Sequence, residues 1–283
     1  MKNKKIAFAA CSLLMTLASV SLTTQAKEWH SIQIATEGVY EPWNRTRPDG
    51  SFDGFEPQMA KVLCERMKIE CTLVAQDWDG LIPGLKAGKF DVIMDALAIS
   101  AERRKVIDFS RPYTDAPATF IAQQSSGLDL GAGNLVLRGD PALDTPVVED
   151  LRNRLKGKLI GIVSGTVYSG FIREQFGQVA TIREYKTPPE PLMDLKNGRV
   201  DVVFEDYGFL AGELQRAGSS DLVLVGPAIS GPIWGEGQGF GIRQGEPELK
   251  AKLDAAIASM IKDGTISELS HKWFRHDFTP PSQ

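Results

Sequence analysis

The sequence contains few of the residues that most often bind metals or act as bases, with 3 cysteines and 3 histidines among 283 residues. The histidines are His30, His271 and His276. Their spacing from the cysteines does not suit zinc, and all three lie near predicted termini. We therefore expect no metal site and no histidine acting as a general base.

Motifs for catalysis and nucleotide binding are also missing. The segment 161–165 has the wrong spacing for a nucleophile elbow. The segment 84–89 is one residue short of a P-loop, and the glycine-rich segment 235–241 precedes a strand instead of linking a strand to a helix. We expect no cofactor, and a binding protein in place of an enzyme.

A long apolar run occurs only at the amino terminus, at residues 6–22, where it follows three lysines. With the small residues at 24–26, this pattern predicts a secretory signal peptide at residues 1–26. A transmembrane anchor is the weaker alternative, because the run is short and rich in Ala, Ser and Thr. No other stretch approaches the ~20 apolar residues of a membrane span, so the mature chain is expected to be soluble.

The formal charge argues against nucleic acid as a partner. Removal of the leader takes away three lysines and no acid, which changes the net charge from −4 to −7. A chain of this charge repels a phosphate backbone.

Two of the cysteines are expected to form a disulfide. Cys11 falls within the leader, where its context loosely resembles a lipoprotein signal but comes too early in the apolar run. Cys64 and Cys71 remain as an even pair in an exported chain. We expect a disulfide that joins the end of one helix to the next strand.

The rest of the chain alternates strands and helices, which is typical of α/β domains. One unit occurs twice, because residues 85–93 and 195–203 share the pattern L-K-x-G-[KR]-[FV]-D-V-[IV]. Each copy predicts a helix end, a glycine turn and a buried strand. Ligands of open α/β sheets bind beyond the carboxyl ends of strands, so residues 95–96 and 205–206 are the first candidates for a site.

The alternation predicts two α/β lobes joined by two crossings. We expect a strand at 118–122 to leave the first lobe, and the segment 226–241, dense in glycine and proline, to return to it. Residues 127–144 are expected to form an irregular insertion before a helix at 147–155. A cleft between two lobes on thin linkers suits ligand binding and hinge motion. The expected boundaries are 27–117 and 229–283 for lobe 1, and 118–228 for lobe 2.

Four acids and one base lie near the predicted strand ends. These residues are Glu37, Asp95, Glu205, Asp206 and Arg103. Each acid alone is typical of a helix cap or a solvated loop, but four at matched positions of two repeats favour a binding site. A guanidinium suits bidentate binding of a carboxylate, and the amides at the helix start 165–167 suit the same anion.

Four aromatic residues are either part of the core or a clamp for a cationic group. These are Tyr40, Trp43, Trp78 and Tyr168. With the acids and the one base, they indicate a small zwitterionic ligand that carries additional positive charge.

The same residues resemble a known family. The matching segments are A-T-E-G-x-Y-x-P-W (35–43), G-F-E (54–56), W-D-G-L-I-P-x-L (78–85), G-K-F-D-V-I-M (88–94), E-R-R (102–104), D-F-S-x-P-Y (108–113) and K-W-F (272–274). They resemble the periplasmic amino-acid-binding proteins of ABC importers, the family 3 solute-binding proteins, over nearly the full mature length. The most similar branch binds lysine, arginine, ornithine and histidine, and has relatives that bind octopine and nopaline.

The resemblance implies a monomeric, two-lobed α/β periplasmic binding protein of type II, with central sheets flanked by helices and a two-stranded hinge. It also implies delivery of a cationic amino acid to a membrane permease of an ABC transporter. Family members carry a disulfide that matches Cys64 and Cys71.

The resemblance further implies a role for each site residue. Tyr40 and Trp78 sandwich the ligand side chain, and Glu37 contacts its cationic end. Arg103 takes the α-carboxylate and Asp206 takes the α-amine. Backbone along the binding strand and at the facing helix start completes the site, through Ala96, Leu97, Ala98, Gly165, Val167 and Tyr168.

Three positions depart from the family pattern. Ala98 and Val167 stand where a hydroxyl residue is usual, so each retains only its backbone amide. Asp95 places a carboxylate where the family has a small or hydroxyl residue, which favours a cationic ligand. Asp206 retains the acid that binds the amine, which favours a basic amino acid over an opine.

Three alternatives remain open at this point. The first is that the ligand is an opine such as octopine or nopaline, because the opine-binding relatives have a similarly long insertion before the second lobe. The second is that the protein is an enzyme similar to a periplasmic cyclohexadienyl or arogenate dehydratase. The third is that the protein presents its ligand to a membrane kinase or chemoreceptor in place of a permease.

Overall fold

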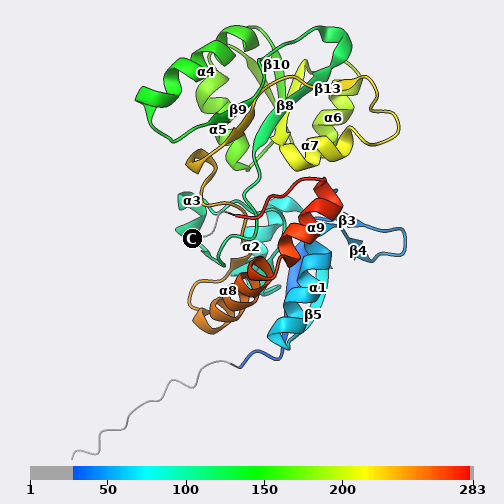
Figure 1. Ribbon diagram of the computed structural model, residues 1–283, viewed down its shortest axis with the longest axis vertical. Helices are drawn as coiled ribbons and strands as arrows, with labels where there is room; N and C mark the ends of the chain where they lie inside the picture. The colour runs from blue at the N-terminus through cyan, green and yellow to red at the C-terminus, as the bar shows by residue number, and fades with distance from the viewer. Residues whose placement is uncertain (1–27, 281–283) are drawn as a thin grey trace, which may run out of the picture.

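The computed structural model describes residues 28–280 and has two α/β lobes, one above the other in Figure 1. The predicted signal peptide and Cys11 lie outside the described residues. Within residues 28–280, none of the helices is long and apolar enough to span a membrane.

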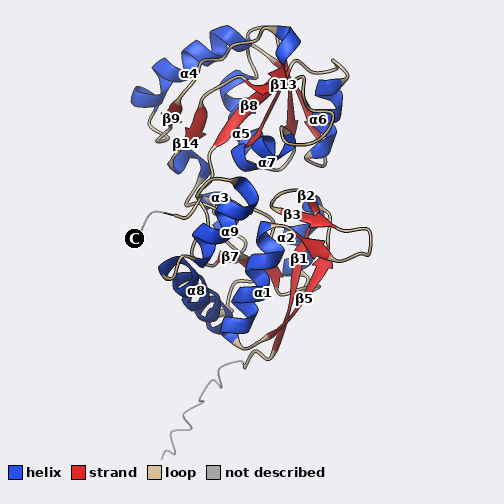
Figure 2. Ribbon diagram, turned by 45° about the vertical axis from the view of Figure 1, so that its right-hand side comes forward, coloured by secondary structure: helices blue, strands red, loops and turns tan. Residues whose placement is uncertain are grey.

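Lobe 1 contains segments from both ends of the described chain, around a five-stranded sheet in the order β5-β1-β6-β15-β7. A small antiparallel sheet, β2-β3-β4, lies on the side that faces lobe 2 (Figure 2). Its elements are β1 (Ser31–Thr36), β2 (Val39–Tyr40), β3 (Asn44–Thr46), β4 (Phe52–Asp53), α1 (Phe55–Met67), β5 (Glu70–Ala75), the 3-10 helix η1 (Trp78–Gly80), α2 (Leu81–Lys86), β6 (Val92–Ile93), α3 (Ala101–Arg104), β7 (Asp108–Phe109), β15 (Gly241–Ile242), α8 (Pro247–Lys262) and α9 (Thr265–Phe274).

Lobe 2 is built on a seven-stranded sheet in the order β11-β10-β12-β8-β14-β9, with β13 also paired to β8. Strands β11, β10 and β12 are parallel, and β8 runs antiparallel to β12. Its elements are β8 (Ala118–Gln123), η2 (Gln124–Ser126), β9 (Asn134–Val136), α4 (Pro141–Leu155), β10 (Leu159–Val163), α5 (Val167–Phe176), β11 (Thr181–Tyr185), α6 (Pro189–Lys196), β12 (Val202–Asp206), α7 (Tyr207–Glu213), β13 (Leu222–Leu224), β14 (Ala228–Ser230) and η3 (Pro232–Trp234).

The two crossings between the lobes lie side by side as a two-stranded hinge. Gln238 of the return segment forms an antiparallel bridge with Thr114 of the outgoing segment. The Gln238 side chain is buried, and its Oε1 accepts hydrogen bonds from Thr114 Oγ1 at 2.9 Å and Ala116 N at 3.3 Å. One side chain therefore couples both crossings.

The predicted repeat is confirmed as one structural unit used twice. In each copy a helix, α2 or α6, ends before a glycine of positive φ, Gly88 or Gly198, and a strand follows. The aspartate of the pattern has the same role in both copies. Asp91 Oδ2 accepts a hydrogen bond from Gln33 N at 3.0 Å, and Asp201 Oδ2 accepts one from Leu159 N at 2.7 Å. Each aspartate thereby ties its strand to the start of the neighbouring parallel strand.

Two local expectations are wrong. Residues 127–144 are not wholly irregular, because they contain β9 and the first turn of α4, which begins at Pro141 and not at 147. Asp140 caps that helix by accepting from Ala142 N at 2.9 Å, and Pro141 suits its first turn. The proline inside the helix, Pro146, concealed this start, because proline usually ends a helical pattern.

We propose that the chain returns from lobe 2 to lobe 1 later than residue 229, the predicted boundary, because residue 229 lies within β14. That strand pairs with β8 and β9 of the lobe 2 sheet. The side chain of Trp234 is buried among aromatic residues of lobe 2, including Tyr168 and Phe171. The proposed crossing therefore follows Trp234.

The predicted disulfide between Cys64 and Cys71 is confirmed, and it joins the end of α1 to β5. We expect loss of this cross-link to lower the free energy of unfolding by about 2 to 3 kcal/mol, because a short closed loop restricts the unfolded chain. Urea unfolding of the double variant Cys64→Ser/Cys71→Ser measures this change. An unfolding midpoint equal to that of the wild type would contradict it.

Candidate functional site

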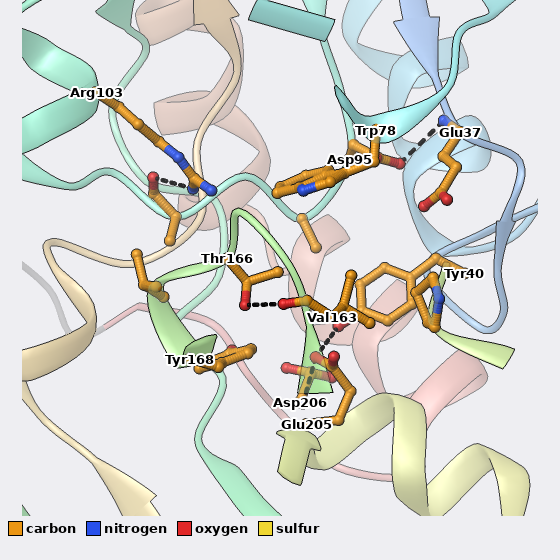
Figure 3. Close-up of a pocket in the computed structure, with 14 residues that line it drawn as sticks. Glu37, Tyr40, Trp78, Asp95, Arg103, Val163, Thr166, Tyr168, Glu205 and Asp206 are labelled. Atoms are coloured by element: carbon orange, nitrogen blue, oxygen red, sulfur yellow. Dashed lines mark hydrogen bonds between the residues drawn. The ribbon is translucent and has the colours of Figure 1, made fainter. Parts of the chain in front are cut away.

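Side chains of both lobes line a cavity between them (Figure 3). The lining residues are Glu37, Tyr40, Trp78, Asp95, Ala96, Ala98, Arg103, Val163, Thr166, Val167, Tyr168, Pro188, Glu205 and Asp206.

The structure brings together all the predicted site residues except two. Leu97 is buried in the core of lobe 1, and its carbonyl accepts from Gly239 N at 3.0 Å. Gly165 does not line the cavity, but its carbonyl accepts from Arg103 Nη2 at 3.2 Å. Leu97 lies beyond the end of β6 and follows Ala96, whose φ is 43°, so its side chain packs in the core while Ala96 and Ala98 line the cavity.

Four lining residues were outside the predicted set of ligand contacts. Glu205 is one of the four acids noted in the sequence, and Thr166 belongs to the predicted helix start. Thr166 caps α5, because its Oγ1 accepts from Ser169 N at 3.0 Å. Val163 and Pro188 carry no signal in the sequence, because apolar residues at a strand end and in a loop are usually structural.

Arg103 provides a buried cation at one end of the cavity. Ser100 caps the short helix α3 by accepting from Arg103 N at 3.3 Å. The guanidinium donates from Nη1 to Ala98 O at 2.9 Å and lies 5.3 Å from the centre of the Trp78 ring. Burial lowers the pKa of Arg103 to about 10, so the side chain remains protonated at neutral pH. A carboxylate is the natural partner for this group.

Asp206 and Glu205 lie at the end of β12 and are hydrogen-bonded to lobe 1. Asp206 Oδ1 accepts from Trp43 Nε1 and from Phe209 N, each at 2.8 Å. Glu205 Oε1 accepts from Tyr40 Oη at 2.8 Å. Asp206 Oδ2 is buried, and within residues 28–280 it has no hydrogen-bond partner. This oxygen is available to a cationic donor in the cavity.

Asp95 and Glu37 form a second acidic pair, at the lobe 1 wall. Asp95 Oδ1 accepts from Thr36 Oγ1 at 3.2 Å, Glu37 N at 3.1 Å and Asn44 Nδ2 at 2.8 Å. In the described part of the chain, neither the buried Asp95 Oδ2 nor the buried Glu37 Oε1 has a hydrogen-bond partner. Figure 3 shows Glu37 and Arg103 at opposite sides of the cavity, with Trp78 between them.

Burial raises the pKa of every acid in the cavity. The pKa is about 9 for Glu37, about 7 for Asp95 and Glu205, and about 6 for Asp206. Repulsion from Asp95 raises the Glu37 value further. Removal of these charges from water is costly, and a cation placed among them offsets that cost.

The aromatic residues divide between the two expected roles. Tyr40, Trp78 and Tyr168 line the cavity, whereas Trp43 is fully buried against Phe55 and Phe274 in the core of lobe 1. Trp43 still acts at the site through its hydrogen bond to Asp206. Of the two roles left open for Trp43, the structure therefore shows the core role, with support to the site through Asp206.

Residues 32–276 match the family model of bacterial extracellular solute-binding proteins, family 3. The chain therefore belongs to that family of solute-binding proteins. It is 38% identical to the octopine-binding periplasmic protein of Rhizobium meliloti, over 95% of this chain and 97% of the relative. It is 31% identical to the L-arginine-binding protein of Pseudomonas aeruginosa, over 93% and 95%.

A solved structure supports the same assignment of fold. A periplasmic His/Glu/Gln/Arg/opine family-binding protein from Silicibacter pomeroyi, in complex with lysine, is 32% identical with a TM-score of 0.72. The match covers 88% of this chain and all of the solved chain. The predicted family and two-lobed fold are thus confirmed.

Proposed function

We propose that the protein is a monomeric periplasmic receptor that binds a cationic amino acid, or a related arginine-derived compound, and delivers it to an ABC-transporter permease. The observation that carries the proposal is the charge of the cavity. Three buried carboxylate oxygens, on Glu37, Asp95 and Asp206, are free to accept hydrogen bonds from a ligand, as judged over residues 28–280. Arg103 faces them as the single base among the lining residues.

Each end of such a ligand has a matching group. Arg103 receives the α-carboxylate, helped by the amides at the start of α5 near Val167. Asp206 Oδ2 receives the α-amine. Tyr40 and Trp78 hold the side chain between them, and its cationic end lies between Glu37 and Asp95.

Ligand binding would stabilise contact between the lobes. Direct contacts already cross the cleft, because Trp78 Nε1 donates to Ser164 O at 3.1 Å and Arg216 pairs with Glu41. A ligand held by Arg103 of lobe 1 and Asp206 of lobe 2 adds to these contacts in the closed form alone. The equilibrium then shifts towards closure about a hinge.

An opine is the second candidate, favoured by the octopine-binding relative. Octopine is an arginine derivative with a second carboxylate. In this cavity that group would lie among acids, because Arg103 is the one base among the lining residues. The charge of the cavity therefore supports a basic amino acid more strongly.

A dehydratase and a sensor fit less well. A prephenate-like dianion needs a base for each carboxylate, and within residues 28–280 Arg103 is the one base that lines the cavity, so we propose that the protein is not an enzyme. Delivery to a permease is proposed over delivery to a receptor kinase because the family serves import. An assay for product from prephenate or arogenate, and the identity of neighbouring genes, test these two alternatives.

The direct test of the proposal is a thermal-shift panel of arginine, lysine, ornithine, histidine, octopine and nopaline. A ligand at ~100 times its dissociation constant adds about 2.7 kcal/mol to the free energy of unfolding. We expect a large upward shift for at least one basic amino acid. The proposal fails if none of the basic compounds raises the unfolding temperature.

Affinity for a cationic ligand is expected to fall as the pH drops from about 8 to about 5. The pKa values of Asp95 and Glu205 are raised to about 7, so the folded protein binds protons that the unfolded chain releases. The contribution of these two groups to the free energy of unfolding is greatest below about pH 4 and is lost as the pH rises through 7. A cationic ligand competes with the protons bound to these two carboxylates. Calorimetry across this pH range, in buffers of different ionisation enthalpy, should show proton release, and a pH-independent affinity would contradict this.

A further inference from the structure

The two oxygens of Asp95 have different surroundings. Oδ1 is saturated by three donors, Thr36 Oγ1, Glu37 N and Asn44 Nδ2. Oδ2 is buried on a side chain that is 2% exposed, and among the described residues it has no hydrogen-bond partner. An acceptor left in this way costs free energy unless a ligand satisfies it.

A buried network behind Asp95 prevents the carboxylate from turning away. Asn44 Nδ2 donates both to Asp95 Oδ1 and to Glu56 Oε2, and Asn44 Oδ1 accepts from Gly38 N. Glu56 Oε1 accepts from Ala96 N at 2.7 Å and from Tyr113 Oη. Met94 N, on the other side of Asp95, donates to Ala35 O at 2.9 Å, so the backbone on both sides is held and the Asp95 side chain is oriented before any ligand arrives.

Glu37 provides a second acceptor at the same end of the cavity. Its Oε1 is buried and likewise has no hydrogen-bond partner in residues 28–280. The two carboxyl groups interact, since repulsion from Asp95 adds to the raised pKa of Glu37, and Asp95 Oδ1 also accepts from the Glu37 backbone amide at 3.1 Å. Both residues line the cavity beside the flat ring of Trp78.

We propose that Asp95 is a specificity-determining residue that, together with Glu37, selects ligands with a guanidinium over those with an ammonium group. This inference rests on the proposed function. A guanidinium presents five N–H donors in one plane, so it can bond to two carboxylates at once while its face lies on an aromatic ring. An ammonium group is a compact point charge that is more strongly hydrated, so it loses more on entering a buried site.

The variant Asp95→Asn isolates the oxygen that faces the ligand. The amide oxygen can keep the three donors of Oδ1, while the amide nitrogen replaces Oδ2 and turns an acceptor into a donor. Three probes are measured by calorimetry: arginine, lysine and citrulline. Citrulline has the chain length of arginine but ends in a neutral ureido group, whose oxygen accepts a hydrogen bond.

For the wild type we expect arginine to bind at least about tenfold more tightly than lysine, the worth of one charge-assisted hydrogen bond. In Asp95→Asn we expect the preference for arginine over lysine to fall by about tenfold. The preference for arginine over citrulline should fall further, because the new donor suits the ureido oxygen. Glu37→Gln changes the second acceptor and should lower both preferences in the same direction.

Asp49→Asn is the matched control. Asp49 is an exposed acid in the turn between β3 and β4, outside the cavity, and the substitution removes the same charge from the same lobe. Its preferences should equal those of the wild type. A change as large as that of Asp95→Asn would attribute the selectivity to net charge and overturn the inference.

The remaining outcomes separate this inference from the proposed function. If the wild type binds lysine as tightly as arginine, the function stands and the selectivity assigned to Asp95 is wrong. The selectivity assigned to Asp95 is also wrong if Asp95→Asn weakens the binding of arginine and lysine equally. If Asp95→Asn does not fold, Glu37→Gln is measured in its place and interpreted in the same way. If no basic amino acid binds to the wild type, the proposed function and the inference both fail.

Discussion

Substitution of Arg103 by alanine is expected to abolish detectable binding of any amino acid. Within residues 28–280, the guanidinium is the one base that lines the cavity, and Arg103 is 9% exposed. Its loss would leave the ligand carboxylate unpaired in a desolvated site, which costs about 3 kcal/mol or more. At 1.4 kcal/mol for each factor of ten, affinity should fall at least about a hundredfold. Calorimetry with arginine measures the loss, and wild-type affinity would refute the assigned role.

The neighbouring Arg104→Ala provides a matched control. Arg104 lies on the same short helix, but it is partly exposed and pairs with Glu236 at 2.7 Å outside the cavity. Its removal should leave the affinity within experimental error, because exposed ion pairs contribute little. Thermal unfolding of both variants shows whether the fold is retained. Equal losses of affinity in the two variants would indicate a general effect of charge.

Substitution of Asp206 by alanine is expected to weaken binding by about tenfold or more, through loss of the partner of the ligand amine. The carboxylate also accepts from Trp43 Nε1 and caps α7 through Phe209 N. Part of the effect is therefore structural and should appear as lower stability. Wild-type affinity in calorimetry would count against this role.

Two further variants separate these contributions. Trp43→Phe removes the indole donor while Asp206 Oδ2 stays in place, so we expect a smaller loss of affinity than in Asp206→Ala. Asp201→Ala removes an acid that directly precedes β12, is not among the cavity-lining residues and accepts through Oδ2 from Leu159 N. It should lower stability without changing the affinity. A loss of affinity in Asp201→Ala equal to that in Asp206→Ala would contradict a direct contact with the amine.

Features that depend on local pattern could be predicted from the sequence. The spacing of apolar residues and glycine turns predicted the main α/β elements, because helices and strands bury one face with a regular period. The repeated unit could be recognised from the sequence itself, because both copies require the same residue types. Each needs a glycine of positive φ, Gly88 or Gly198, and an aspartate that accepts a hydrogen bond from the backbone of the neighbouring strand. The disulfide followed from an even pair of cysteines in an exported chain. Most of the candidate site followed from polar residues placed where strands end.

Features that depend on contacts between distant residues were decided only by the tertiary structure. Nothing local to Trp43 shows that its ring is buried in lobe 1 while its Nε1 donates to Asp206 of lobe 2. Nor does local sequence show that Leu97 is buried in the core between two residues that line the cavity, because the segment after β6 is irregular and Ala96 has a φ of 43°. The sequence determined the acids, the base and the two lobes. The fold decided which carboxylate oxygens lack a partner, because Asp95 Oδ2 is distinguished from Oδ1 only by the donors that Thr36 and Glu37 at the end of β1 and Asn44 in β3 provide.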